Sequence, residues 1–294
     1  MITRRFLLGS GVAASFLLPA AHALAAPRPG SALGGAPTLA LPRSAPLPPR
    51  SQPPRTLSPP LVLLDPGHGG KDPGATGVSG TYEKHIALAA ALELRRQLLA
   101  SGRYRVELTR TGDVFIPLEE RVAIAQRRGA GLFVSMHADA VGDHGVRGAS
   151  VYTLADTASD AQSAALATRE NAADRFGGPA FRNAPPDVAR ILASLVRQET
   201  RAGSARMQRG VVSALQGDLR LLQNPARHAG FVVLKAADIP SVLVEMGFMS
   251  NREDEAALRR PQYRARIAAA MKRAVDAYFN GAPAGPPQGG RMAG

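Results

Sequence analysis

Three of four side chains that could carry out a hydrolysis stand at the ends of short apolar segments, and the fourth begins an expected helix. His68 lies in DPGHGGKDPG, directly after the aliphatic run 61–64, and His137 and Glu245 directly follow LFVSM and SVLV. Glu83 stands in the first turn of an expected helix. A hydrolytic zinc site needs three His or carboxylate ligands, an open fourth position and a nearby general base. His68, Glu83 and His137 are the candidate ligands. Glu245 is the candidate base, because partial burial at a strand exit would raise its pKa.

Each of these four residues also has a simpler structural explanation. His68 could be a hydrogen-bonded turn residue, Glu83 could complement the positive end of a helix dipole, and Glu245 could be an ion-pair partner. The chain has no cysteine, so disulfides and thiolate ligands are excluded and a metal must be held by His, Asp and Glu. The combination of the four residues, rather than any one of them, indicates a metal site.

Short apolar runs alternate with helical patterns between residues 61 and 279, which is typical of an α/β sheet covered by helices. Ligands of such sheets gather at the carboxyl ends of strands, where His68, His137 and Glu245 are expected. We therefore predict a single α/β domain over 61–280, with a mostly parallel central sheet, helices on both faces and a helical insertion. The expected strands are 61–64, 104–109, 132–136, 149–153, 230–234 and 241–244, and the expected helices are 83–100, 117–128, 253–259 and 262–279.

The stretch 155–216 does not follow this alternation, because it is mostly helical in pattern and lies between two expected strands. Its first half contains an Ala-rich segment, 160–176, which stops at Gly177-Gly178. Its second half carries an apolar stripe at helical spacing, made of Val188, Ile191, Leu192, Leu195 and Val196. We interpret the whole stretch as a helical insertion with a function of its own.

The two ends of the chain differ in composition from its centre. Residues 1–26 combine Arg4-Arg5, a short apolar run and a small-residue cleavage site, which is typical of an export signal. The paired arginines resemble a twin-arginine signal, and a Sec signal is the alternative. Residues 27–60 are rich in Pro, Gly and Ser and read as a disordered linker, and 281–294 read as a disordered tail. We expect a periplasmic protein that is a soluble monomer after processing.

The basic charge of the chain is uneven. Residues 1–60 carry six arginines and no acid, which leaves 30 of the 36 basic residues against all 23 acids in the remainder. A moderately basic exported domain suits an anionic polymer of the cell envelope. Aromatic residues make up only 5% of the chain, Trp is absent and no nucleic-acid-binding motif occurs, which argues against a nucleic-acid partner.

Five stretches complete a family pattern. They are LLDPGHGGKDPGATG, the YEK at 82–84, LTRTGDVFIPLEERVAIA, FVSMHADA and VLVEMGFMSN, in this order over residues 61–251. Together they resemble the zinc-dependent N-acetylmuramoyl-L-alanine amidases, the amidase-3 type of bacterial cell-wall hydrolase. The resemblance implies cleavage of the amide between N-acetylmuramic acid and the L-alanine that begins the peptidoglycan stem peptide.

Carried over position by position, the family's zinc ligands fall on His68, Glu83 and His137, and its catalytic glutamate falls on Glu245. One Zn²⁺ ion is therefore the implied cofactor. Arg110, Asp113 and Arg121 belong to the same stretches, and we expect them in structural ion pairs rather than in catalysis.

The resemblance also suggests a function for the insertion. The division amidases of this family carry a helical insertion that blocks the zinc until an activator with a LytM-type domain pulls it away. ALATRENAADRFGG resembles that blocking helix, so Glu170 is the implied zinc-blocking carboxylate. The face formed by Val188, Leu192 and Leu195 is the candidate binding surface for the activator. An autoinhibited amidase of this type would split the septal wall at cell separation.

One feature departs from the division amidases. Relatives often carry a β-rich targeting module ahead of the catalytic domain, whereas here only the stretch 27–60 separates the signal from that domain. This departure puts septal targeting through such a module in doubt.

Two other functions remain open at this point. A catalytically inactive wall-binding homologue is disfavoured, because such a relative usually loses one of the four site residues. A zinc peptidase acting on the stem peptide alone would use the same chemistry, and the sequence does not separate it from the amidase.

Overall fold

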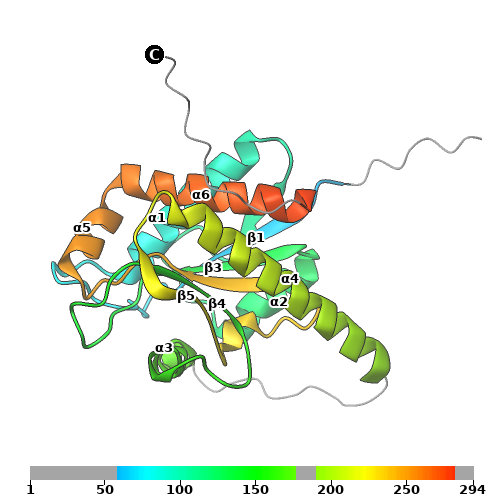
Figure 1. Cartoon of the computed structure of the whole chain (residues 1–294), viewed down its shortest axis with the longest axis horizontal. Coiled ribbons are helices and arrows are strands. Elements are labelled where there is room, and N and C mark those ends of the chain that lie inside the picture. Colours follow the sequence, from blue (N-terminus) through cyan, green and yellow to red (C-terminus); the bar gives the residue numbers. More distant parts are fainter. Residues whose placement is uncertain (1–57, 177–189, 282–294) are drawn as a thin grey trace, which may run out of the picture. The chain divides into compact units, whose positions relative to one another are not determined.

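The computed structural model describes residues 58–176 and 190–281, and those residues form a six-stranded sheet with helices on both faces (Figure 1). The strand order is β2-β1-β3-β6-β4-β5. The strands are β1 (Leu61–Pro66), β2 (Arg105–Leu108), β3 (Leu132–His137), β4 (Ala149–Leu154), β5 (Leu221–Ala229) and β6 (Ser241–Glu245). The first four in this order run parallel, whereas β4 is antiparallel to β6 and β5 is parallel to β4. The expected α/β domain with a mostly parallel sheet is confirmed.

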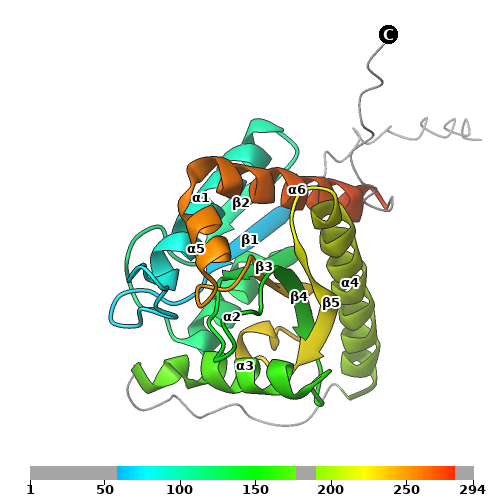
Figure 2. The same ribbon diagram turned by 60° about the vertical axis from the view of Figure 1, so that its left-hand side comes forward.

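Two helical layers cover the sheet (Figures 1 and 2). The first contains α1 (Glu83–Ala100), α4 (Arg190–Gln216) and α6 (Pro261–Asn280), of which α6 packs against both others. The opposite face is covered by α2 (Leu118–Arg128), α3 (Ala161–Asn171) and the 3₁₀ turn η2 (Val232–Leu234). Between the layers lie β1 and β3, which are buried along their whole length, as the central strands of a parallel sheet must be. Two short elements, η1 (Ala172–Phe176) and α5 (Arg252–Arg259), complete the fold.

One expected strand is wrong. The segment 230–234 is not a strand, because β5 spans Leu221–Ala229 and the 3₁₀ turn η2 follows it. The apolar residues of this segment pack beneath the layer formed by α2 and α3, where Phe231, Val233 and Leu234 are all buried. The true strand is an edge strand with mostly exposed or half-buried residues, so its sequence LLQNPARHA lacks the apolar run that marks a central strand.

The stretch 155–216 contains α3, η1 and α4. The second half of α4 packs into the core of the layered domain with α6, through Met207, Val211, Ala214 and Leu215. These four residues therefore belong to the core of the domain, whereas α3 packs on the other face of the sheet in the layer that also contains α2. Val188 lies outside the described residues, and Leu192 and Leu195 lie on α4 in the part whose side chains are not described.

The expected signal 1–26, the linker up to residue 57 and the tail beyond residue 281 also lie outside the described residues. In the part of the chain that the structure describes, the helices are too short or too polar to cross a membrane.

Candidate metal centre

Neighbouring strands bring the candidate ligands together. The strands β1, β3 and β6 are adjacent and parallel, so their carboxyl ends meet at one edge of the sheet, with His137 directly beside Glu245 in the register. His68 follows β1 and Glu83 begins α1. Glu170, near the end of α3, reaches the same point from the other helical layer.

Four buried residues, His68, Glu83, His137 and Glu170, each direct one possible ligand atom to a common region, with these atoms within 4.8 Å of one another. Nδ1 of His137 lies 3.0 Å from Oε1 of Glu83 and 3.1 Å from Oε2 of Glu170. Nε2 of His68 lies 3.1 Å from Oε2 of Glu83 and 3.5 Å from Oε2 of Glu170. The structure thus brings together all three predicted ligands and the predicted blocking carboxylate.

The geometry of His68 fits a metal ligand. Its Nε2 is buried and has no hydrogen-bond partner, although Glu83 is only 3.1 Å away. Two imidazole nitrogens and two carboxylates form the nitrogen and oxygen donor set that zinc accepts in tetrahedral sites. The donors present therefore fit a zinc ion.

Hydrogen bonds hold two of the candidate ligands, His68 and Glu83, in place. Nδ1 of His68 donates to Oδ2 of Asp72 at 2.8 Å, which leaves Nε2 free to bind a cation. Glu83 accepts hydrogen bonds from the backbone amides of Ala75 and Ala138 at 2.9 and 2.8 Å. Asp72 is not among the residues predicted from the sequence. Its position four residues after His68 in the same stretch was the available signal.

Glycines make room for this cluster. A Cβ atom on Gly67 would lie 2.3 Å from the ring of His137, and one on Gly74 would lie 2.6 Å from the ring of His68 and 2.7 Å from Oε2 of Glu83. His68 itself has a φ of 61°, a left-handed conformation that is uncommon outside glycine. The loop after β1 therefore has small residues because side chains would occupy the space of the ligands.

Two buried arginines fix this loop. Arg110 donates to the carbonyl oxygens of Pro66 and Gly67, and Arg121 donates to those of Pro66 and His68. Arg121 also forms a buried ion pair with Asp65 at 2.8 Å, as expected.

Asp113 likewise forms the expected ion pair, here with Lys84 at 2.7 Å. Arg110, in contrast, acts on the loop through hydrogen bonds to carbonyl groups.

Glu245 is the only one of the four predicted site residues outside the cluster of ligand atoms. It is completely buried, one carboxylate oxygen accepts the backbone amide of Asp139 at 3.0 Å, and the other has no hydrogen-bond partner. Burial raises the pKa of Glu245 well above its ordinary value, and the neighbouring carboxylates of Glu83, Asp139 and Glu170 raise it further. A raised pKa of this kind is typical of a carboxylate that acts as a general base or acid.

The cluster itself favours a cation. Burial acts to lower the pKa of His68, but the carboxylates of Glu83 and Glu170 outweigh it and hold that pKa well above the ordinary value. For His137, too, burial acts to lower the pKa, but the carboxylates of Glu170 and Glu83 outweigh it and raise that pKa. Burial raises the pKa of Glu170, which indicates that a buried carboxylate at this position needs a positive partner.

Polar contacts hold α3 against the site. Arg169 forms an ion pair with Asp139, Asn171 exchanges hydrogen bonds with the backbone of Gly230 and Val232 at 2.9 and 2.8 Å, and Asp174 accepts the first amide of α2 at 2.8 Å. A cavity of about 340 Å³ lies beside the cluster. Its lining includes His68 and Asp72 of the loop after β1, Asp139, and Thr168, Arg169, Glu170, Ala172 and Ala173 of α3 and η1.

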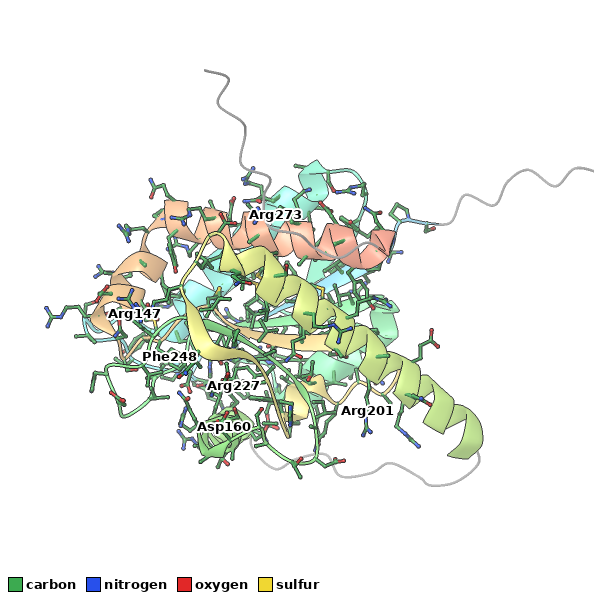
Figure 3. All side chains as sticks on the ribbon, viewed as in Figure 1. Arg147, Asp160, Arg201, Arg227, Phe248 and Arg273 are labelled. Atoms are coloured by element: carbon green, nitrogen blue, oxygen red, sulfur yellow. The ribbon has the colours of Figure 1, made fainter. Side chains whose placement is uncertain are left out.

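The other end of α3 is also anchored. Asp160 caps the helix by accepting the backbone amide of Ser163 at 2.7 Å, and it pairs with Arg227 of β5 at 3.3 Å (Figure 3). The helix is therefore fixed at both ends, with Glu170 near the end that faces the cluster.

A family model described as N-acetylmuramoyl-L-alanine amidase matches residues 62–277. The chain belongs to this amidase family. The N-acetylmuramoyl-L-alanine amidase AmiA of Salmonella typhimurium is 40% identical over 227 residues, which cover 77% of this chain and 78% of that protein. The amidase AmiC2 of Nostoc punctiforme has a solved structure that is 30% identical, with a TM-score of 0.51, covering 75% of this chain and 97% of that one.

A further solved relative is a complex of an amidase with a partner. The CwlD amidase from Clostridioides difficile, in complex with the GerS lipoprotein, is 25% identical, with a TM-score of 0.54, and covers 75% of this chain and 98% of that one. The two solved relatives share the fold described above, and the chain is an enzyme of the same class.

Proposed function

We propose that this amidase uses a zinc ion to hydrolyse the amide between N-acetylmuramic acid and the L-alanine of the peptidoglycan stem peptide. His68, Glu83 and His137 would hold the ion, and Glu245 would act as the general base. The observation that carries this proposal is the convergence of buried imidazole and carboxylate donors, with the hydrogen-bond-free Nε2 of His68 among them. Zinc at this position would polarise the scissile carbonyl and lower the pKa of a water molecule.

The residues of the chain account for the proton transfers. The free oxygen of Glu245 accepts a proton from the attacking water and passes it to the departing nitrogen, and its raised pKa favours holding that proton in between. Asp72 keeps the proton of His68 on Nδ1, so that Nε2 stays available. Arg110 and Arg121 hold the loop that carries His68 in one conformation.

We further propose that α3 keeps the amidase inactive at rest. The carboxylate of Glu170 lies 3.1 Å from Nδ1 of His137, where it would occupy the fourth position of the ion. Release would require a partner protein, and we propose a LytM-domain activator that binds the face of Val188, Leu192 and Leu195. The GerS complex of CwlD supports the general idea that an amidase of this fold binds a partner. Export by the twin-arginine route to the periplasm and a function in septal wall splitting complete the proposal.

Digestion of purified peptidoglycan tests the activity. The zinc-loaded protein lacking residues 160–180 is expected to release free stem peptides that begin at L-alanine, which mass spectrometry identifies, and a chelator is expected to abolish this release. The intact protein is expected to release far less. Glu245→Gln in the shortened protein is the matched control and is expected to be inactive.

The same digest separates the competing functions. Shorter peptides lacking the terminal L-alanine would show a stem-peptide peptidase. Binding to peptidoglycan without any release would show an inactive wall-binding protein. Equal release by the intact and the shortened protein would contradict the inhibitory function of α3.

A further inference from the structure

Asp139 lies between the proposed base and the cavity. It comes two residues after His137, and its backbone amide donates to Glu245 at 3.0 Å. Its carbonyl oxygen accepts the backbone amide of Met249 at 2.8 Å. Both contacts are with the segment that contains and follows β6, so the backbone of Asp139 is fixed independently of α3. Its side chain lines the cavity beside the cluster.

The carboxylate of Asp139 is nearly buried and is paired with a side chain of α3. Its side chain is 7% exposed, and its partner Arg169 is 43% exposed. Among the residues that the structure describes, Arg169 is the only cationic side chain within ion-pair distance of this carboxylate. The helix α3 thus presents two neighbouring groups to the site, the carboxylate of Glu170 to the ligand cluster and the guanidinium of Arg169 to Asp139.

Withdrawal of α3 would change the surroundings of Asp139. Arg169 would leave with the helix, whereas Asp139 would stay, because its backbone is bonded to Glu245 and Met249. Without Arg169 the carboxylate of Asp139 would line an open cavity and would have no cationic partner among the described residues. The open site would therefore offer this carboxylate to a positively charged group at the position that the guanidinium of Arg169 had occupied.

Hydrolysis of the proposed substrate produces such a group. The bond between the carbonyl carbon and the amide nitrogen breaks, the carbon takes the oxygen of water and leaves as a carboxylate, and both water protons end on the nitrogen. The stem peptide therefore leaves with an α-ammonium group. We propose, on the basis of the proposed function, that the carboxylate of Asp139 binds the nitrogen of the departing stem peptide and that Arg169 occupies this subsite in the closed enzyme.

The test compares proteins in which α3 no longer presents its two polar groups. The background carries Arg169→Gln and Glu170→Ala, and the test protein carries Asp139→Asn in addition. Because a hydrogen bond to a charged group contributes about a tenfold to hundredfold effect, Asp139→Asn is expected to lower kcat/KM by that factor. Asp143→Asn in the same background is the matched control, since Asp143 is an exposed acid on the same loop, and it is expected to change nothing.

A binding measurement reports on the same subsite without catalysis. Isothermal titration calorimetry with a stem peptide that begins at a free L-alanine amine is expected to show about tenfold weaker binding to the Asp139→Asn protein. The N-acetylated peptide has no ammonium group and is expected to bind both proteins equally. Asp139→Glu is expected to recover part of the affinity for the free amine. Zinc content and thermal unfolding of each variant exclude a purely structural effect.

Equal affinity of the free amine for the background and the Asp139→Asn protein would overturn the assignment of Asp139. The proposed function fails in a different way, namely when the zinc-loaded background releases no stem peptide from peptidoglycan. The calorimetric result does not depend on that release, so the two failures are distinguishable.

Discussion

At the scale of single residues, the chemistry of the site depends on which nitrogen of His68 carries the proton. The hydrogen bond of Nδ1 to Asp72 at 2.8 Å fixes the proton on that side, and the hydrogen-bond-free Nε2 faces Glu83 and Glu170. Carboxylates that orient metal-binding histidines in this way also make the imidazole a stronger ligand. Asp72 therefore belongs to the proposed metal centre without being one of its proposed ligands.

We predict that Asp72→Asn lowers the affinity for zinc about tenfold to a hundredfold, because the amide no longer supports the ligand with a negative charge. A competition titration against a zinc-binding dye measures this change. Asp156→Asn is the matched control, since the side chain of Asp156 is 98% exposed, and it should leave the affinity unchanged. An unaltered affinity in Asp72→Asn would show that Asp72 only shapes the loop.

A second prediction concerns Glu245. Its pKa lies well above the ordinary value of 4.5, chiefly because the residue is completely buried. A general base acts in its ionised form, so kcat/KM of the shortened amidase should rise with pH through this raised pKa rather than near pH 4.5. Glu245→Gln should lose about a hundredfold to ten-thousandfold in rate together with this dependence. A pH profile of peptide release measures both, and a profile already flat above pH 5 would contradict the raised pKa.

The sequence predicted His68, Glu83, His137 and Glu245 because strand exits and a helix start are visible in apolar patterns. Asp72 was missed because a carboxylate four residues after a histidine in a glycine-rich loop has many possible partners, and only the loop geometry selects one. Glu170 came from the family resemblance, since nothing in local spacing places a residue of α3 beside the ends of β1 and β3.

At the scale of elements, α3 combines a small apolar contact with many polar ones. Its buried apolar residues are Leu166 and Ala167, whereas its end near the site is held by the contacts of Arg169, Glu170 and Asn171. Elements with little buried apolar surface open at a low free-energy cost. This composition suits a helix that must leave the site without disturbing the core.

We predict that Asn171→Ala raises the basal activity of the full amidase. The substitution removes hydrogen bonds to the backbone of Gly230 and Val232, each of which contributes about 1 kcal/mol. Loss of about 2 kcal/mol increases the open population by up to about 30-fold. Peptide release from peptidoglycan measures the change, and Ala165→Ser, at an exposed position of α3, is the control without effect. Unchanged release in Asn171→Ala would show that these two bonds do not hold the helix closed.

The segment around β5 shows where apolar patterns mislead. An apolar run predicts burial, and Phe231, Val233 and Leu234 are indeed buried. They lie not in a strand but in a 3₁₀ turn and at its N-cap, under the helical layer. The edge strand before them pairs through its backbone with β4 alone, so its polar side chains do not prevent it from forming. Pairing of this kind depends on the neighbouring strand, which periodicity along the chain does not reveal.

At the scale of the whole molecule, the buried carboxylate of Asp65 connects three strands and a helix. Asp65 lies on β1 and accepts hydrogen bonds from Thr109, which follows β2, and Ser135 of β3, at 2.6 and 2.8 Å. It also pairs with Arg121 of α2. The guanidinium of Arg121 in turn donates hydrogen bonds to the carbonyl oxygens of Pro66 and His68. Folding of the sheet, docking of α2 and placement of the loop that carries His68 therefore depend on one polar cluster.

We predict that Arg121→Met lowers the free energy of unfolding by about 3–5 kcal/mol, because it leaves the carboxylate of Asp65 buried and without its cationic partner. The matched control is Arg127→Ala on the same helix. Arg127 pairs with Glu120, but both side chains are about half exposed or more, at 60% and 48%. An exposed pair contributes about 0–1 kcal/mol, so the control should unfold almost as the unaltered protein does.

Urea denaturation of both variants measures these changes. Zinc affinity provides the second readout, because Arg121 also holds the carbonyl group of His68 at 2.8 Å. If Arg121 positions the loop as well as stabilising the fold, the folded Arg121→Met protein should bind zinc more weakly even in the absence of urea. If zinc affinity is unchanged while stability falls, Asp65 and Arg121 stabilise the layers only, and the loop after β1 keeps its conformation through Arg110 and its glycines.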